Sequence, residues 1–120
     1  MRSDEWIGVD FDGTLVTRVE WTDKFEDKRI GEPIWPMINR VKRWIREGKQ
    51  VRIVTARVAR GFDPTAKHWM DVRNWTFAML GQHLPVTSEK DPYMVELWDD
   101  RAIQLEPDTG RRVDMRTDNG

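Results

Sequence analysis

The stretch WIGVDFDGTLV, residues 6–16, joins a short apolar run to two carboxylates. Residues 6–9 carry no charge and do not alternate with polar residues, a pattern typical of a strand buried in a parallel sheet. The run ends at Asp10, and Asp12 follows two positions later. Carboxylates at the end of a buried strand repel each other and lose hydration, so they need a compensating partner. The stretch therefore predicts a strand whose carboxyl end carries a charged site.

The chain beyond this stretch continues with helix and strand patterns in turn. A helix is predicted from Pro36 to about residue 47, because proline suits a first helical turn and the following Gly48 suits a C-terminal cap. Residues 50–54 form the next strand pattern and lead to Thr55.

A second helix is predicted from Thr65, a suitable N-cap, to Leu80. Its expected buried face consists of residues at helical spacing, namely Trp69, Val72, Thr76 and Met79, while His68 is expected on its surface. Four further segments are predicted: an irregular flap at 17–33, a short strand at Val86, a strand at 93–100 that ends in Asp99 and Asp100, and a closing strand at 102–107.

This order of strands and helices predicts an α/β fold with a doubly wound parallel sheet and right-handed crossovers. Such sheets bind ligands beyond the carboxyl ends of their strands. Asp10, Thr55 and Asp99 each follow a separate predicted strand, so we expect them to converge at one edge.

The converging residues suit a phosphate and magnesium site. Mg²⁺ prefers about six oxygen ligands, and Asp10, Asp99 and Asp100 offer carboxylates for it. The hydroxyl of Thr55 and the ammonium of Lys90 would then hold the oxygens of a phosphoryl group. A different basic residue in the place of Lys90 is the alternative.

The composition sets the limits of function. The 120 residues include 20 basic and 21 acidic side chains, so the formal charge of −1 gives no global reason to expect nucleic acid or membrane as a partner. There is no cysteine, which excludes disulfides and thiolate sites. We expect one domain over residues 1–112, a loose polar tail at 113–120 and, because no signal peptide or membrane span is recognisable, a cytoplasmic protein.

Four motifs, VDFDGTL, VRIVT, EKDP and ELWDDRA, resemble in the same order the motifs of the haloacid dehalogenase superfamily of Mg²⁺-dependent phosphohydrolases. The resemblance spans nearly the whole chain and implies a Rossmann-like, doubly wound α/β fold. It implies that Asp10 is the nucleophile that forms an aspartyl-phosphate. Asp12 would be the general acid for the leaving group and then the general base for water.

The resemblance also implies the binding groups. The substrate site would include Thr55, Lys90, Gly13 and Thr14, and the Mg²⁺ site would include Asp10, Asp12 through its carbonyl, Asp99 and Asp100. Only about twenty residues separate Asp12 from the first predicted helix, too few for the cap domain of many relatives. An open site of this kind suits a large substrate or a cap supplied by a partner subunit, so an oligomer is possible.

Residues 55–57, TAR, are similar to the SGR of 3′-phosphatase domains in phage repair kinases. There the matching arginine contacts the phosphoryl group, so Arg57 is a candidate substrate ligand; a structural salt bridge is the equal alternative. The similarity implies a phosphorylated nucleotide or nucleic-acid end as the substrate and a phage or bacterial origin.

A non-catalytic phosphate-binding module, or a receiver-like signalling domain, is the competing interpretation. Receivers also place acidic residues, a threonine and a lysine at strand ends, but their phosphorylated aspartate follows a middle strand. In this chain the middle strand ends in Thr55, and DFDGT includes Asp12, which a receiver does not need. The sequence therefore favours a phosphatase.

Overall fold

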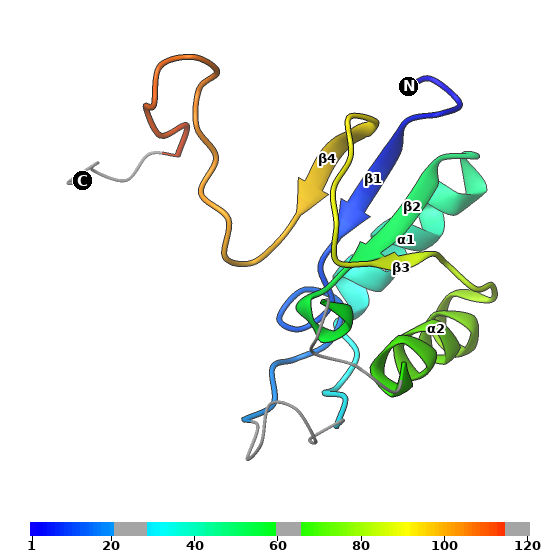
Figure 1. Ribbon diagram of the computed structural model, residues 1–120. Coiled ribbons are helices and arrows are strands. Elements are labelled where there is room, and N and C mark those ends of the chain that lie inside the picture. Colours follow the sequence, from blue (N-terminus) through cyan, green and yellow to red (C-terminus); the bar gives the residue numbers. More distant parts are fainter. Residues whose placement is uncertain (21–28, 60–65, 115–120) are drawn as a thin grey trace.

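The computed structural model describes residues 1–20, 29–59 and 66–114 (Figure 1). Its elements are β1 (Trp6–Val9), α1 (Trp35–Arg46), β2 (Gln50–Val54), the short 3-10 helix η1 (Ala56–Val58), α2 (Lys67–Leu80), β3 (Val86–Thr87) and β4 (Met94–Trp98). The strands form one parallel sheet in the order β3-β2-β1-β4. The prediction of an α/β fold with a parallel sheet is confirmed.

Alternate residues of β1 and β2 build the core on one face of the sheet. Ile7, Val9, Val51 and Ile53 are each at most 3% exposed, and they belong to one apolar cluster with residues of α1 and α2. Burial of each such side chain contributes about 1.5–3 kcal/mol. Because β1 has a strand on both sides, all of its residues are buried, and its carboxyl end is fixed at the centre of the sheet.

Helix α1 covers this core as predicted. Its buried side chains are spaced for a helix and comprise Met37, Ile38, Val41 and Trp44. Pro36 lies in its first turn, and Gly48, with a φ of 80°, follows its last turn. Gly48 therefore ends the helix as predicted, because glycine readily adopts the positive φ that is common just after a helix.

The second face of the sheet differs from a doubly wound fold. Helices α1 and α2 contact each other and share one core, and residues 88–93 connect β3 to β4 without a helix (Figure 1). Asp91 of this segment accepts hydrogen bonds from Trp6 Nε1 at 2.9 Å and from Arg52 Nη1 at 3.4 Å. Since a helical crossover needs about a dozen residues, a short loop takes its place, and the described residues show no second helical layer.

Helix α2 buries only part of the face predicted for it, because Val72 and Thr76 are buried as expected but Trp69 is not. Its buried side chains are His68, Val72, Thr76 and Leu80. Trp69 is 39% exposed, whereas His68, expected on the surface, is 1% exposed. The Thr76 hydroxyl donates to the Arg73 carbonyl at 2.7 Å within the helix and accepts the Leu84 N–H at 3.0 Å. The second bond ties this face of α2 to the chain that follows the helix.

The predicted closing strand at 102–107 does not join the sheet. Leu105 and Arg112 form an isolated antiparallel bridge, and the Val113 N–H donates to the Gln104 carbonyl at 2.9 Å. Asp108 and Gly110 have φ values of 65° and 75° in the turn between the two halves. We call residues 101–114 the C-terminal arm, which projects away from the sheet (Figure 1). Backbone groups of this segment bond to each other across the turn, so the segment forms a hairpin of its own instead of a fifth strand of the sheet.

Some predictions fall partly outside the described residues. Pro33, the last residue of the flap, pairs with Val16 just before it in an antiparallel bridge, but residues 21–28 are not described. The N-cap predicted at Thr65 and most of the loose tail lie outside the described ranges as well.

Candidate active site

The carboxyl ends of β1, β2 and β4 set the position of the predicted site. The chain runs from β1 to β2 and β3 on one side and then returns to β4 on the other side of β1. Val9 of β1 is in register with both Ile53 and Trp98, and the Asp10 N–H donates to the Trp98 carbonyl at 2.9 Å. The residues that follow these strands therefore meet at a switch point, where α/β sheets bind their ligands.

Three carboxylates meet at this point. One oxygen from each of Asp10, Asp99 and Asp100 lies within 4.8 Å of the others. Burial, together with the nearby charges of Asp99 and Asp100, raises the pKa of Asp10 to about 7 from 3.8. We call these residues the acidic triad. Hard carboxylate oxygens are the ligands that Mg²⁺ prefers, and a divalent cation would offset their repulsion. The donor set therefore fits the predicted ion.

Each carboxylate after β4 is held by a specific group. Asp99 Oδ1 accepts the Arg101 N–H at 2.7 Å. Asp100 Oδ2 accepts Arg18 Nη2 at 2.7 Å and Nε at 3.1 Å, and its Oδ1 accepts the Thr14 hydroxyl at 3.4 Å. Burial acts to raise the pKa of Asp100, but the Arg18 hydrogen bond and charge outweigh it and hold that pKa below the usual value. Arg18 thus favours the ionised form of Asp100.

Arg18 is a site residue that the sequence interpretation did not assign to phosphate binding. Its guanidinium binds Asp100 directly, and the charges of Asp10 and Asp12 also raise its pKa. Arg18 lies in the charged, irregular flap, where no motif distinguishes it from its neighbours. Only the folded structure reveals its contact with Asp100.

Gly13 brings the loop after β1 close to Asp100. It has a φ of 88°, and a Cβ at this position would lie 2.4 Å from Asp100 Oδ2. Its N–H donates to the Val16 carbonyl at 2.7 Å and closes the turn. Any larger residue would meet both backbone strain and a steric clash. Gly13 and Thr14, both predicted for the substrate site, therefore line the side of the crevice formed by Asp100.

The Asp12 side chain does not join the triad. Its two carboxylate oxygens accept Arg57 Nε and Nη2, each at 2.8 Å. Arg57 is 1% exposed, and the Asp12 side chain is 22% exposed. The two predicted catalytic carboxylates are thus separated, with Asp10 in the triad and Asp12 paired to a cation.

Thr55 lies where the sequence predicted it, at the end of β2. It is 3% exposed, its N–H donates to the Thr87 carbonyl at 2.8 Å, and its Oγ1 accepts the Arg57 N–H at 3.2 Å. Since a hydroxyl both accepts and donates, its proton stays available for a phosphoryl oxygen.

Lys90 is not brought to the triad by any contact. It is exposed in the segment 88–93 and forms no hydrogen bond or ion pair within the described ranges. The neighbouring Asp91 is bonded to Trp6 at the start of β1, and four residues of strand, about 13 Å, separate the backbone of Trp6 from that of Asp10. The role of Lys90 as the cation that holds the phosphoryl group therefore stays a prediction.

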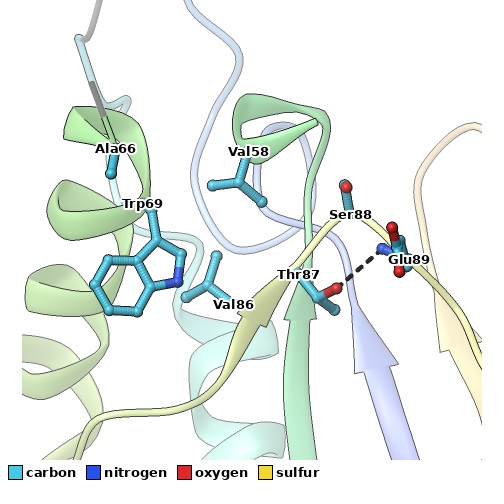
Figure 2. A pocket seen from close by; sticks show the side chains of 7 residues that line it. All are labelled: Val58, Ala66, Trp69, Val86, Thr87, Ser88 and Glu89. Atoms are coloured by element: carbon cyan, nitrogen blue, oxygen red, sulfur yellow. Dashed lines mark hydrogen bonds between the residues drawn. The ribbon is translucent and has the colours of Figure 1, made fainter. Parts of the chain in front are cut away.

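Two hollows adjoin this edge of the sheet. One, of about 300 Å³, includes Gly13, Thr14, Trp98, Asp99 and Asp100 in its lining and so opens onto the triad. The other, of about 400 Å³, lies between η1, the start of α2 and the end of β3. Figure 2 shows Trp69 opposite Val58 and Val86 there, with Thr87, Ser88 and Glu89 along the other side. Room for a substrate therefore exists beside Thr87, the backbone partner of Thr55.

Comparison with known proteins supports the fold alone. No protein family matches the sequence, and no curated protein is significantly similar to it. A solved structure of a conserved protein from Bacteroides thetaiotaomicron matches with a TM-score of 0.58 and 22% sequence identity, over 85% of this chain and 80% of that one. Within the described residues, neither helix is long and apolar enough to cross a membrane.

Proposed function

We propose that the chain is a Mg²⁺-dependent phosphomonoesterase of the haloacid dehalogenase type, with Asp10 as its nucleophile. The observation that carries the proposal is the separation of the two aspartates of DFDGT. Asp10 shares the triad with Asp99 and Asp100, whereas Asp12 is held apart by Arg57. A reaction that needs one carboxylate near a metal and another for proton transfer requires this division.

The proposed reaction has two steps. In the first, an Asp10 oxygen attacks phosphorus, the bond to the leaving oxygen breaks, and the Asp12 carboxyl group gives its proton to that oxygen. In the second, Asp12 takes a proton from water, the water oxygen attacks phosphorus, and the Asp10–phosphorus bond breaks. The Thr55 hydroxyl steadies the phosphoryl oxygens, and Gly13, which has no side chain, lets the loop backbone approach the phosphoryl group closely. Bound Mg²⁺ would offset the repulsion between a carboxylate and a phosphate dianion.

The substrate we propose is a phosphorylated nucleotide or nucleic-acid end. The sequence leaves too few residues between Asp12 and α1 for a cap domain, and the hollow beside Trp69 offers an aromatic wall for a base. Lys90 or Arg18 would supply the cation for the phosphoryl group, and Arg18 is the one in contact with the triad.

Hydrolysis of p-nitrophenyl phosphate tests the reaction. We expect activity with Mg²⁺, its loss with EDTA, and a loss of about 10³-fold or more in Asp10→Asn. Asp108→Asn, in the C-terminal arm, is the matched control and should behave as the unmodified chain does. Full activity in Asp10→Asn would exclude the nucleophile assignment.

A substrate panel tests the substrate class. It would compare 3′-phosphorylated DNA and RNA ends, mononucleotides, sugar phosphates and phosphopeptides by release of inorganic phosphate. A receiver-like module would hydrolyse none of these and would instead accumulate a stable phosphoryl group on an aspartate after incubation with a small acyl phosphate, detected as a mass increase.

A further inference from the structure

We infer that Arg57 is a positioning residue: it holds the Asp12 carboxylate for proton transfer and does not bind the phosphoryl group of the substrate. This inference rests on the proposed function. It decides between the two roles that the sequence left equal for Arg57, and it gives this arginine a different partner from the one implied by the repair-kinase similarity.

The first argument is the geometry of the pair. Nε and Nη2 form one edge of the guanidinium, and both donate to Asp12 at 2.8 Å. Such a bidentate pair fixes a carboxylate in plane as well as in distance. Each carboxylate oxygen has a second acceptor site, so Asp12 can still carry the transferred proton. A phosphoryl group could use this edge of Arg57 only by breaking the pair.

The second argument is burial and support. Arg57 is 1% exposed, so its side chain does not reach into the open crevice. Its Nη2 also donates to the Arg29 carbonyl at 2.7 Å, and its guanidinium carbon lies 5.5 Å from the centre of the Phe11 ring. The Arg57 N–H is bonded to Thr55. The guanidinium is therefore held from several sides in the position that pairs with Asp12.

The third argument is the charge of the neighbouring triad. Asp12 is two residues from Asp10, and a carboxylate at that distance would turn toward a divalent cation if nothing held it. Arg57 supplies the competing cation. It thereby keeps the Asp12 carboxylate off the metal and free for acid–base work.

The experiment compares leaving groups. A general acid matters most for a poor leaving group, such as an alkoxide, and little for p-nitrophenolate, which leaves without a proton. We expect Arg57→Lys and Arg57→Gln to lower kcat/KM for an alkyl phosphate by about 10²-fold or more, and for p-nitrophenyl phosphate by roughly tenfold or less. Asp12→Asn should likewise lose more activity with the alkyl phosphate than with p-nitrophenyl phosphate. Adding Arg57→Gln to Asp12→Asn should lower kcat/KM little further. Arg52→Lys, remote from the site, is the control.

A phosphate-binding role would give a different result. The variants would then lose the same factor with every leaving group, and inorganic phosphate would inhibit them more weakly than it inhibits the unmodified chain; either result overturns the inference. If no chain hydrolyses any phosphate, the proposed function fails, and calorimetric Mg²⁺ titration still tests the inference. Arg57→Gln should then bind Mg²⁺ more tightly, and Arg57→Gln/Asp12→Asn should not. Equal Mg²⁺ affinities in all three chains would contradict it.

Discussion

The raised pKa of Asp10 makes the stability of the folded chain depend on pH. Its pKa is about 7 in the folded chain because of burial and the charges of Asp99 and Asp100, against an ordinary value of 3.8. Between these values the folded state keeps a proton that the unfolded state has lost. The resulting stabilisation is full below about pH 4 and is lost as the pH rises through about 7.

This shift predicts the pH dependence of the metal-free chain. In EDTA, the melting temperature of the unmodified chain relative to that of Asp10→Asn should fall from about pH 5 to about pH 8. Differential scanning calorimetry of the two chains in matched buffers measures it. The comparison removes the contribution of titrating groups that do not interact with Asp10. A constant difference between the two chains across this range would show that burial does not perturb Asp10.

Substitution of Gly13 should weaken Mg²⁺ binding as well as stability, because the added side chain would meet Asp100. Gly13→Ala adds a Cβ at a φ of 88° and 2.4 Å from Asp100 Oδ2, so we expect a loss of about 1–3 kcal/mol in unfolding free energy and weaker Mg²⁺ binding. Gly81→Ala has the matched strain, with a φ of 83° and no atom within 4 Å of the added Cβ. That control should lose stability alone, as urea unfolding and calorimetry would show. Equal Mg²⁺ affinities in the two variants would rule out the contact with Asp100.

Arg18 and Lys90 compete for one role, the cation that binds the phosphoryl group. Arg18 contacts Asp100, whereas Lys90 is exposed and without a contact to the triad. We expect Arg18→Ala to weaken competitive inhibition by inorganic phosphate by roughly tenfold or more, the loss of a charge-assisted hydrogen bond, and Lys90→Ala to change it little. The reverse order would restore the lysine of the EKDP motif to the role that the resemblance implies.

At the scale of the element, Trp98 joins α1 to the strand that carries the triad. Its ring centre lies 5.1 Å from that of Trp44, and the Arg40 guanidinium carbon lies 4.9 Å from it. Trp98 is the last residue of β4 and directly precedes Asp99. Packing of Trp98 against Trp44 therefore helps to fix the position of Asp99 and Asp100 at the end of β4.

Trp98→Ala should consequently affect both stability and the site. Removal of this partly buried indole costs up to about 3 kcal/mol, which urea unfolding would detect, and Mg²⁺ affinity should fall because β4 loses its support. Trp98→Phe keeps an aromatic contact and should keep most of both properties. Tyr93→Ala, an exposed aromatic residue just before the same strand, is the control for a general effect on β4. A loss in Trp98→Ala no larger than that in Tyr93→Ala would contradict this role.

The elements also show which features the sequence could predict. The strands before Asp10, Thr55 and Asp99 followed from apolar runs and the polar residues that end them, and their parallel order placed the three together. The pairing of Arg57 with Asp12, and of Arg18 with Asp100, could not be read in this way, because a side-chain partner depends on tertiary packing. The buried face of α2 was predicted correctly at Val72 and Thr76 but not at Trp69, which is apolar and yet 39% exposed.

At the scale of the whole molecule, the sheet has helices on one face and the segment 88–93 on the other. Apolar side chains remain exposed by 41% to 53% in β4 and the C-terminal arm, namely Val95, Leu97, Ile103, Leu105 and Val113. Self-association would make any melting temperature depend on protein concentration. Sedimentation at the concentrations used for melting should therefore accompany each measurement, and it would also settle the oligomeric state that the sequence left open.

The triad brings together residues that follow the first and the last strand of the sheet. We therefore expect Mg²⁺ to stabilise the fold. Asp10 follows the first strand and Asp99 and Asp100 the last, so the three carboxylates meet only when the sheet is formed. A ligand that binds only the folded state at about tenfold its Kd adds about 1.4 kcal/mol, which for a domain of this size raises Tm by roughly 5 °C. Asp99→Asn and Asp100→Asn should lose most of this increase, whereas Asp108→Asn should keep it, with NaCl of equal ionic strength as the reference. An equal increase in all four chains would show that Mg²⁺ acts as a general salt and that the triad does not bind it.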